Sequence, residues 1–281
     1  MNFAVFGLNA KCAVAPDVVT RLAQAVEEMG YDSWWVGEHV VLPSPRVAPA
    51  PMEPTDPILD PFVHLAYVAA VTTTLELATG IIILPQRNPV VLAKQAASLD
   101  VLSAGRLILG VGAGYLEPEM SAIGVSLKER GSRTDEYLEV MNALWNDPAP
   151  EHHGRYFDFA GIDAHPRPVQ KGGPRIVIGG RSPAALERAV SRAHGWYGFW
   201  LNVDATKACL DGLRAAADRV ERPAHLGPLE ISITPQGLVS AETLAEYEAL
   251  GVDRLVVYPL PIDHEDEIGA ALEKQAVLIG G

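Results

Sequence analysis

The chain has 281 residues, of which 48% are hydrophobic and 20% charged, so it can bury a large core and is not intrinsically disordered. Its formal net charge is −13, which disfavours nucleic acid and anionic membranes as partners. The two cysteines, Cys12 and Cys209, lie far apart and fit neither a disulfide framework nor a zinc site. We therefore expect a cytoplasmic protein with no signal peptide, membrane span or metal centre.

Strand-like and helix-like segments alternate along the chain. Residues 2–8 are apolar and favour a strand, and Pro16 then opens a helix that ends at Gly30. The later strands are expected at 33–37, 76–84, 106–111, 175–178, 196–200, 230–234 and 254–258. The later helices are expected at 61–74 and 89–102, after a cap at Ser132, and near 183–193, 204–221, 240–250 and 264–277.

This order gives eight strands, each followed by a helix, and such alternation implies parallel pairing through right-handed crossovers. Eight units of about 35 residues match a single (β/α)8 TIM barrel domain over residues 1–281. The segment 146–174 is expected to be an insertion between the fourth helix and the fifth strand, mainly surface loop with some extended structure. A doubly wound open sheet is the alternative, but it needs fewer strands and a nucleotide loop after the first strand.

A barrel of this kind builds its active site at the C-terminal ends of the strands. Glu38 and His39 end the second strand, where a carboxylate and an imidazole suit proton transfer. The alternative is that His39 hydrogen-bonds the loop and Glu38 pairs with a cation. Gly80 lies inside the third strand, which indicates either a bulge approached by a ligand or simple packing.

Two glycine-rich segments follow the fourth and fifth strands. The run GVGAGY at 110–115 has Tyr115 where a dinucleotide fingerprint needs glycine, so it predicts contact with a flat ring or a tight turn. In GGRSP at 179–183, Ser182 is the expected N-cap and Pro183 the first helical residue. Unpaired N–H groups at a helix start attract anions, and an adjacent arginine adds charge. We therefore predict a phosphate site there, with an ordinary capped helix as the alternative.

Six longer motifs along the chain are specific when they are taken together. They are GYDSWWVGEH at 30–39, LATGIIILP at 77–85, AKQAASLD at 93–100, LSAGRLILGVGAG at 102–114, RTDEYL at 133–138 and IGGRS at 178–182. In these motifs the chain resembles, over nearly its whole length, the bacterial-luciferase-like monooxygenase superfamily of TIM barrels. It most resembles the branch that uses the deazaflavin coenzyme F420.

The resemblance implies a flavin-type ring at the C-terminal mouth of the barrel, and a homodimer. It implies a bulge in the third strand with a cis peptide between Gly80 and Ile81 that supports the ring. It also implies that His39 is the acid–base residue beside the redox face of the ring, with Glu38 next to it. The other cofactor-binding residues that it implies are Ala113 and Gly114 at the ring, and Gly179, Gly180, Arg181 and Ser182 at the phosphate.

Two departures from the family pattern bear on the reaction. Some deazaflavin dehydrogenases carry Asp before the histidine and Glu after the glycine-rich run, where this chain has Glu38 and Tyr115. The sugar-phosphate chemistry of those enzymes is therefore not carried over. The branch that uses FMN often supplies an arginine at the rim of the fourth strand, and the run 110–115 has none, which favours F420.

The first hypothesis is therefore an oxidoreductase that transfers a hydride between F420 and a small organic substrate. The proline-rich loop 42–60 would form part of the rim, and its apolar residues favour an apolar or mixed substrate. The alternative is an FMN-dependent monooxygenase that uses O2. The second alternative is a cofactor-binding barrel without catalytic activity.

Overall fold

The computed structural model describes residues 1–279 and forms a closed barrel of parallel strands. Nine strands follow the order β3-β2-β1-β11-β10-β9-β8-β5-β4, and an additional pairing between β3 and β5 closes the ring. β3 and β4 share one place in the ring, so the barrel has eight strand positions, which confirms the predicted (β/α)8 TIM barrel. The strands are β1 (Asn2–Phe6), β2 (Ser33–Val36), β3 (Glu76–Thr79), β4 (Ile82–Ile83), β5 (Leu107–Gly112), β8 (Arg175–Gly179), β9 (Gly195–Leu201), β10 (Glu230–Pro235) and β11 (Arg254–Val257).

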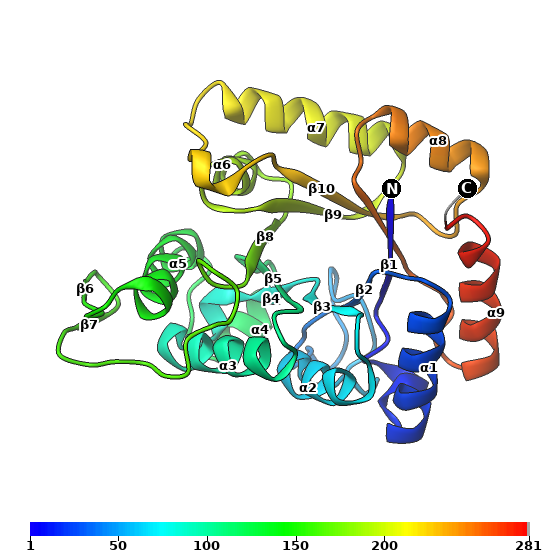
Figure 1. Ribbon diagram of the computed structural model, residues 1–281, viewed down its shortest axis with the longest axis horizontal. Helices are drawn as coiled ribbons and strands as arrows, with labels where there is room; N and C mark the ends of the chain where they lie inside the picture. Colours follow the sequence, from blue (N-terminus) through cyan, green and yellow to red (C-terminus); the bar gives the residue numbers. More distant parts are fainter. Residues whose placement is uncertain (280–281) are drawn as a thin grey trace.

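Helices follow every strand position and cover the outside of the barrel (Figure 1). They are α1 (Pro16–Glu28), α2 (Pro61–Val71), α3 (Pro89–Leu102), α4 (Glu117–Ala122), α5 (Arg130–Asn146), α6 (Pro183–Arg192), α7 (Val203–Ala217), α8 (Ala241–Ala249) and α9 (Glu265–Ala276). Short 3-10 turns form η1 (Lys11–Val14), η2 (Leu84–Gln86) and η3 (Ala224–Leu226).

Proline and a polar cap set the start of three barrel helices. Asp60, Asn88 and Ser182 each accept a hydrogen bond from a backbone amide of the first turn, and proline is the next residue in all three. The predicted cap at Ser182 is therefore confirmed. The predicted cap at Ser132 is wrong, because α5 already begins at Arg130 and Ser132 lies inside its first turn.

Several segments differ from the predicted boundaries or add to them. β1 ends at Phe6 instead of residue 8, and α7 ends at Ala217 instead of residue 221. The third strand was expected over 76–84, but it breaks after β3 and resumes as the short β4. α2 was expected to end at residue 74, but it ends at Val71, because the backbone of Thr72 is extended. The insertion 146–174 carries the predicted extended structure as the hairpin of β6 (His152–His153) and β7 (Asp158–Phe159), which lies beside α5 (Figure 1).

Apolar side chains fill both the barrel and the layer between barrel and helices. The interior cluster contains Ala4, Phe6, Trp35, Ala78, Ile108, Val177, Tyr197 and Val256. The outer layer is larger, and it joins the outward side chains of the strands to the inner faces of the helices. Each large side chain buried in this way contributes about 1.5–3 kcal/mol to stability.

Charged side chains fill the N-terminal end of the barrel. Arg254, at the start of β11, is 2% exposed. Its guanidinium contacts the carboxylates of Asp32 at 2.9 Å, Glu76 at 3.0 Å and Glu230 at 2.5 Å. Because these partners occupy the N-terminal end, the space for a ligand has to be sought at the opposite end. Within residues 1–279, no helix is long and apolar enough to cross a membrane.

Candidate active site at the C-terminal mouth

The residues predicted to form the site meet at one mouth of the barrel. They follow the C-terminal ends of β2, β3, β5 and β8, which are consecutive positions in the ring. All these pairings are parallel, so the four strand ends point the same way. The end of β2 carries Glu38 and His39, the break after β3 carries Gly80 and Ile81, and the loops after β5 and β8 carry Ala113, Gly114 and residues 180–182.

The break in the third strand is a bulge built around one side chain. The peptide between Gly80 and Ile81 is cis, as the resemblance implied. A Cβ on Gly179 would lie 2.8 Å from Cδ1 of Ile81, and a Cβ on Gly112 would overlap the same atom. The two glycines therefore make room for Ile81, and the bulge packs directly on β5 and β8.

Glu38 is held by a dense set of donors. Its side chain is almost fully buried, the amide of Ile83 donates to Oε2 at 2.6 Å, and Nε of Arg87 donates to Oε1 at 2.8 Å. Arg87 also pairs with Asp60 at 2.7 Å. Burial raises the pKa of Glu38, while the guanidinium of Arg87 acts in the opposite direction. The carboxylate thus ties β2 to β4 and to the start of α3, and it does not project freely into the mouth.

His39 has a carboxylate partner that lies 80 residues further along the chain. Nδ1 of His39 lies 3.0 Å from Oε2 of Glu119, and the backbone amide of Val40 donates to Oε1 of the same carboxylate at 2.6 Å. The Glu119 side chain is fully buried, whereas 10% of the His39 side chain is exposed. His39 also packs edge-on against Tyr115, with ring centroids 6.2 Å apart. The imidazole is therefore oriented from two sides at the mouth.

The loop after β8 presents exposed backbone at the start of a helix. Gly180 has φ of 109°, a conformation that favours glycine, and residues 180–182 are exposed. The hydroxyl of Ser182 accepts from the amide of Ala185 at 3.3 Å, so α6 begins as predicted. Nε1 of Trp196 donates to the carbonyl of Gly180 at 2.8 Å and fixes the loop to β9. This arrangement can bind an anion through amides and the nearby Arg181.

Ala113 and Gly114 line the next part of the mouth. Both are half-buried. Gly114 has φ of 85°, and a Cβ there would lie 2.7 Å from Cγ2 of Ile83 and 3.0 Å from the sulfur of Met120. The end of the glycine-rich run therefore has to be glycine to pass between β4 and α4.

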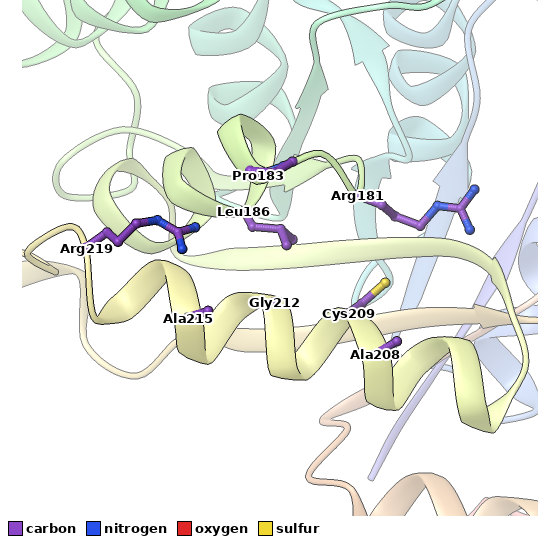
Figure 2. Close-up of a pocket in the computed structure, with 8 residues that line it drawn as sticks. All are labelled: Arg181, Pro183, Leu186, Ala208, Cys209, Gly212, Ala215 and Arg219. Carbon is purple, nitrogen blue, oxygen red and sulfur yellow. The ribbon is translucent and has the colours of Figure 1, made fainter.

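A groove of 440 Å³ separates α6 from α7 (Figure 2). Its wall is mostly apolar and includes Leu186 and Cys209, with Arg181 and Arg219 near its ends. Figure 2 shows the Arg181 side chain extending away from Leu186. The groove shares Arg181 with the predicted phosphate loop.

Aromatic rings form one side of the mouth. The ring of Phe6 lies 5.0 Å from those of both Phe199 and Tyr258, and Trp200 lies 6.2 Å from Tyr258. Phe199 and Trp200 lie near the C-terminal end of β9 and are 44% and 38% exposed. A Cβ on Gly80 would lie 3.4 Å from Phe6, so this aromatic wall is continuous with the bulge.

A family model for luciferase-like monooxygenases matches residues 1–269. The chain belongs to this family. An uncharacterized protein of Mycobacterium tuberculosis is 30% identical over 98% of both chains. The oxygenase component of a flavin-dependent trigonelline monooxygenase of Acinetobacter baylyi is 31% identical over 62% of this chain and 46% of its own length.

Two solved structures share the fold over almost the whole length of both chains. The monooxygenase RslO1 of Streptomyces bottropensis has a TM-score of 0.78 and 20% identity, covering 99% of this chain and 98% of its own. The coenzyme F420-dependent tetrahydromethanopterin reductase of Methanopyrus kandleri has a TM-score of 0.75 and 16% identity, covering 98% of both chains. At these identities the structures establish the shared barrel fold.

Sequence reasoning missed three features of the mouth. Glu119 lies in the six-residue α4, which is too short to carry a periodic apolar pattern and was not predicted. Arg87 was not linked to Glu38, from which it is separated by 49 residues. The aromatic wall that Trp200 shares with Phe199 and Tyr258 was not predicted.

Proposed function

We propose that this member of the luciferase-like family is an oxidoreductase that binds coenzyme F420 and transfers a hydride to or from a small organic substrate. The observation that carries the proposal is the placement of an oriented imidazole, His39, and an anion-binding helix start, at Gly180–Ser182, on the same mouth. The family consists of flavin- or deazaflavin-dependent oxidoreductases, which supports an enzymatic role. The lack of arginine in the run 110–115 favours F420 over FMN.

The residues at the mouth fit a phosphate-bearing cofactor with a flat ring. The exposed amides at the start of α6 and the nearby Arg181 would hold the phosphate. Ile81 at the bulge, with Ala113 and Gly114, would support the ring. The deazaflavin supplies the hydride donor or acceptor when it is bound.

The protein contributes proton transfer and orientation. We propose His39 as the catalytic residue that takes or gives the proton accompanying hydride transfer, since imidazole changes charge near neutral pH. Glu38 was predicted to share this role. Its bonds to Ile83 and Arg87 instead support a positioning role, in which it holds the end of β2 against the bulge.

The aromatic wall and the loop 42–60 support an apolar substrate. Phe199 and Trp200 offer exposed ring surface at the mouth. Val40 and Val41, which follow His39, and Val47 of the loop are exposed apolar residues. A substrate with an apolar body and one oxidisable or reducible carbon–oxygen group would match these surfaces and His39.

Separate titrations with F420 and FMN test the choice of cofactor. We expect F420 to quench the fluorescence of Trp200 and its neighbours, and the loss of part of this signal in Trp200→Phe would assign it to the mouth. Tight binding of FMN with no response to F420 would reverse the proposal. Turnover is then followed through the absorbance of oxidised F420 with a panel of apolar alcohols and ketones.

An FMN-dependent monooxygenase is the second candidate, because the A. baylyi relative is named as flavin-dependent and S. bottropensis RslO1 as a monooxygenase. A separate reductase would then deliver reduced flavin, and the two candidates differ in oxygen use. We expect F420-linked turnover to continue without oxygen. Oxygen consumption that depends on both reduced FMN and substrate would favour the monooxygenase.

Substitution of His39 separates an enzyme from a binding barrel without activity. We expect His39→Ala to abolish turnover while cofactor affinity stays within about tenfold, which is about 1.4 kcal/mol. Cofactor binding with no turnover in the wild type would instead favour the non-catalytic barrel, and unchanged turnover in His39→Ala would reject His39 as the catalytic residue.

We also propose a homodimer. The exposed apolar side chains Val63 and Tyr67 of α2, and Val91 and Leu102 of α3, support it, because these two helices are neighbours on the barrel. Light scattering of the purified protein tests the proposal, and a monomer at micromolar concentration would overturn it.

A further inference from the structure

We infer that Glu119 is the positioning residue that fixes the orientation and tautomer of His39. The inference rests on the proposed function, in which His39 exchanges a proton with the substrate. Its basis is the geometry of α4, which places a fully buried carboxylate against the imidazole at the end of β2. The carboxylate spans the two neighbouring residues there, with one oxygen facing the His39 ring and the other the amide of Val40.

The chemistry of the pair determines the tautomer. An ionised carboxylate can only accept hydrogen bonds, so the contact of 3.0 Å requires the proton on Nδ1 of His39. In the neutral ring, Nε2 is then the unprotonated nitrogen. Within residues 1–279, Nε2 of His39 has no hydrogen-bond partner and is not among the fully buried unpaired atoms, so it is the nitrogen left for the substrate. Glu119 thereby sets His39 to act as a base through Nε2.

Because Glu119 is buried, its carboxylate needs the hydrogen bonds from His39 and Val40. Glu119 is fully buried beside Leu116 and Met120, which are also buried, and its hydrogen-bond partners among the described residues are the two groups at the end of β2. A buried carboxylate requires such donors, because it has lost its hydration. The short helix α4 is therefore held to β2 through the same atoms that orient the imidazole.

Nitrogen NMR of the wild-type protein tests the inference without any cofactor or substrate. Spectra of 15N-labelled histidine are recorded at alkaline pH, where neutral imidazole dominates, and comparison with His39→Gln assigns the His39 ring. We expect the proton on Nδ1 and an unprotonated Nε2. A His39 ring protonated mainly on Nε2 would overturn the inference.

For Glu119→Gln, which has a side chain of the same shape, we expect the tautomer of His39 opposite to that of the wild type. The amide of Val40 has to donate to the glutamine carbonyl, which turns the glutamine NH2 toward Nδ1 of His39. The proton then moves to Nε2, and the base is lost. We expect the tautomer to invert and turnover with F420 to fall by about 100-fold or more, while cofactor affinity changes less than about tenfold.

Glu136→Gln is the matched control. Glu136 is also buried and lies beside a histidine, with its Oε1 3.6 Å from His152, but α5 and the β6–β7 hairpin place it outside the mouth. We expect this variant to leave the His39 signals and turnover unchanged. If the tautomer inverts in Glu119→Gln but the wild type shows no turnover with F420, the positioning role is retained and the proposed reaction is rejected. An unchanged tautomer in Glu119→Gln, or unchanged turnover, would reject the positioning role.

Discussion

The indole Nε1 of Trp196 donates a hydrogen bond of 2.8 Å to the carbonyl oxygen of Gly180. Trp196 is fully buried on β9, and Gly180 is exposed in the loop that opens α6. The bond thus connects the barrel core to the peptide units that would bind an anion. Because it fixes one carbonyl of the loop, it also fixes the direction of the adjoining amides.

We predict that Trp196→Phe weakens binding of the cofactor phosphate. The loss of the hydrogen bond and of part of the ring should cost about 1–3 kcal/mol of stability. Trp145→Phe is the control, because Trp145 is also buried and donates to the carbonyl of Ala93 at 3.0 Å, away from the mouth. Both variants should unfold at lower temperature, but only Trp196→Phe should raise the dissociation constant of F420. Equal affinity in the two variants would contradict the role of Trp196.

A second prediction concerns the backbone of the same loop. Gly180 has φ of 109°, and a Cβ there would lie 3.2 Å from Cβ of Ala185. Gly180→Ala should therefore cost about 1 kcal/mol or more and shift the amides at the helix start. Gly227→Ala is the control, with φ of 62° and no atom within 4 Å of the new Cβ. Calorimetric titration should show at least tenfold weaker F420 binding in Gly180→Ala and unchanged binding in Gly227→Ala.

Much of the barrel could be predicted because its signals are local. Each strand is a short apolar run, and Pro16, Pro89 and Pro183 mark helix starts that the structure confirms. The positions of Glu38, His39 and Gly180 at strand ends followed from these assignments and the rule that barrel sites lie at C-terminal ends. The cis peptide at Gly80 came from the family resemblance, since local pattern indicated a bulge or packing.

The partners of these residues could not be predicted, because they depend on contacts that are distant in sequence. Arg87 reaches Glu38 across 49 residues, and Glu119 reaches His39 across 80. Nothing in the residues around Glu119 distinguishes it from the exposed Glu117 two positions earlier, because burial is decided by how α4 lies against β2. The roles of the buried polar residues at the mouth therefore have to be read from the three-dimensional structure.

The third prediction is a pH dependence of stability that arises from His64. This side chain is buried in α2, accepts a hydrogen bond of 3.0 Å from Nε1 of Trp34, and has its pKa lowered to about 4 by burial. The unfolded chain binds a proton to this histidine below pH 6.5 or so, whereas the folded chain does not until about pH 4. The stability that the neutral ring contributes is therefore present above about pH 6.5 and is lost progressively as the pH falls toward 4.

His64→Gln keeps an acceptor for Trp34 and removes the titration. Between pH 7 and about pH 4.5, the stability of this variant relative to wild type should rise by roughly 2–3 kcal/mol. Urea unfolding at several pH values measures the difference, and His153→Gln, at a site that is 68% exposed, is the control with no such change expected. A constant difference between His64→Gln and wild type across this range would contradict the assignment.

The fourth prediction concerns the charged end of the barrel. Arg254 is buried and forms ion pairs with Asp32, Glu76 and Glu230. Arg254→Met removes this positive charge from the three carboxylates. Burial already raises the pKa values of Asp32 and Glu76 against the attraction of their arginines. At pH 7 the variant should lose about 3–5 kcal/mol, whereas Arg219→Met, which breaks the exposed pair with Glu187, should lose less than about 1 kcal/mol.

The same substitution should separate stability from binding. Without Arg254 the pKa values of Asp32 and Glu76 rise further, so their protonation at lower pH relieves the repulsion, and the stability lost at pH 7 should shrink at pH 5. The charged end and the mouth lie at opposite ends of the strands, so F420 affinity of the folded fraction should stay within about twofold of wild type, since distant sites act independently. Urea unfolding and calorimetric titration measure the two quantities. A stability loss that grows at pH 5, or a large loss of F420 affinity at full folding, would show that Arg254 does more than neutralise its three carboxylates.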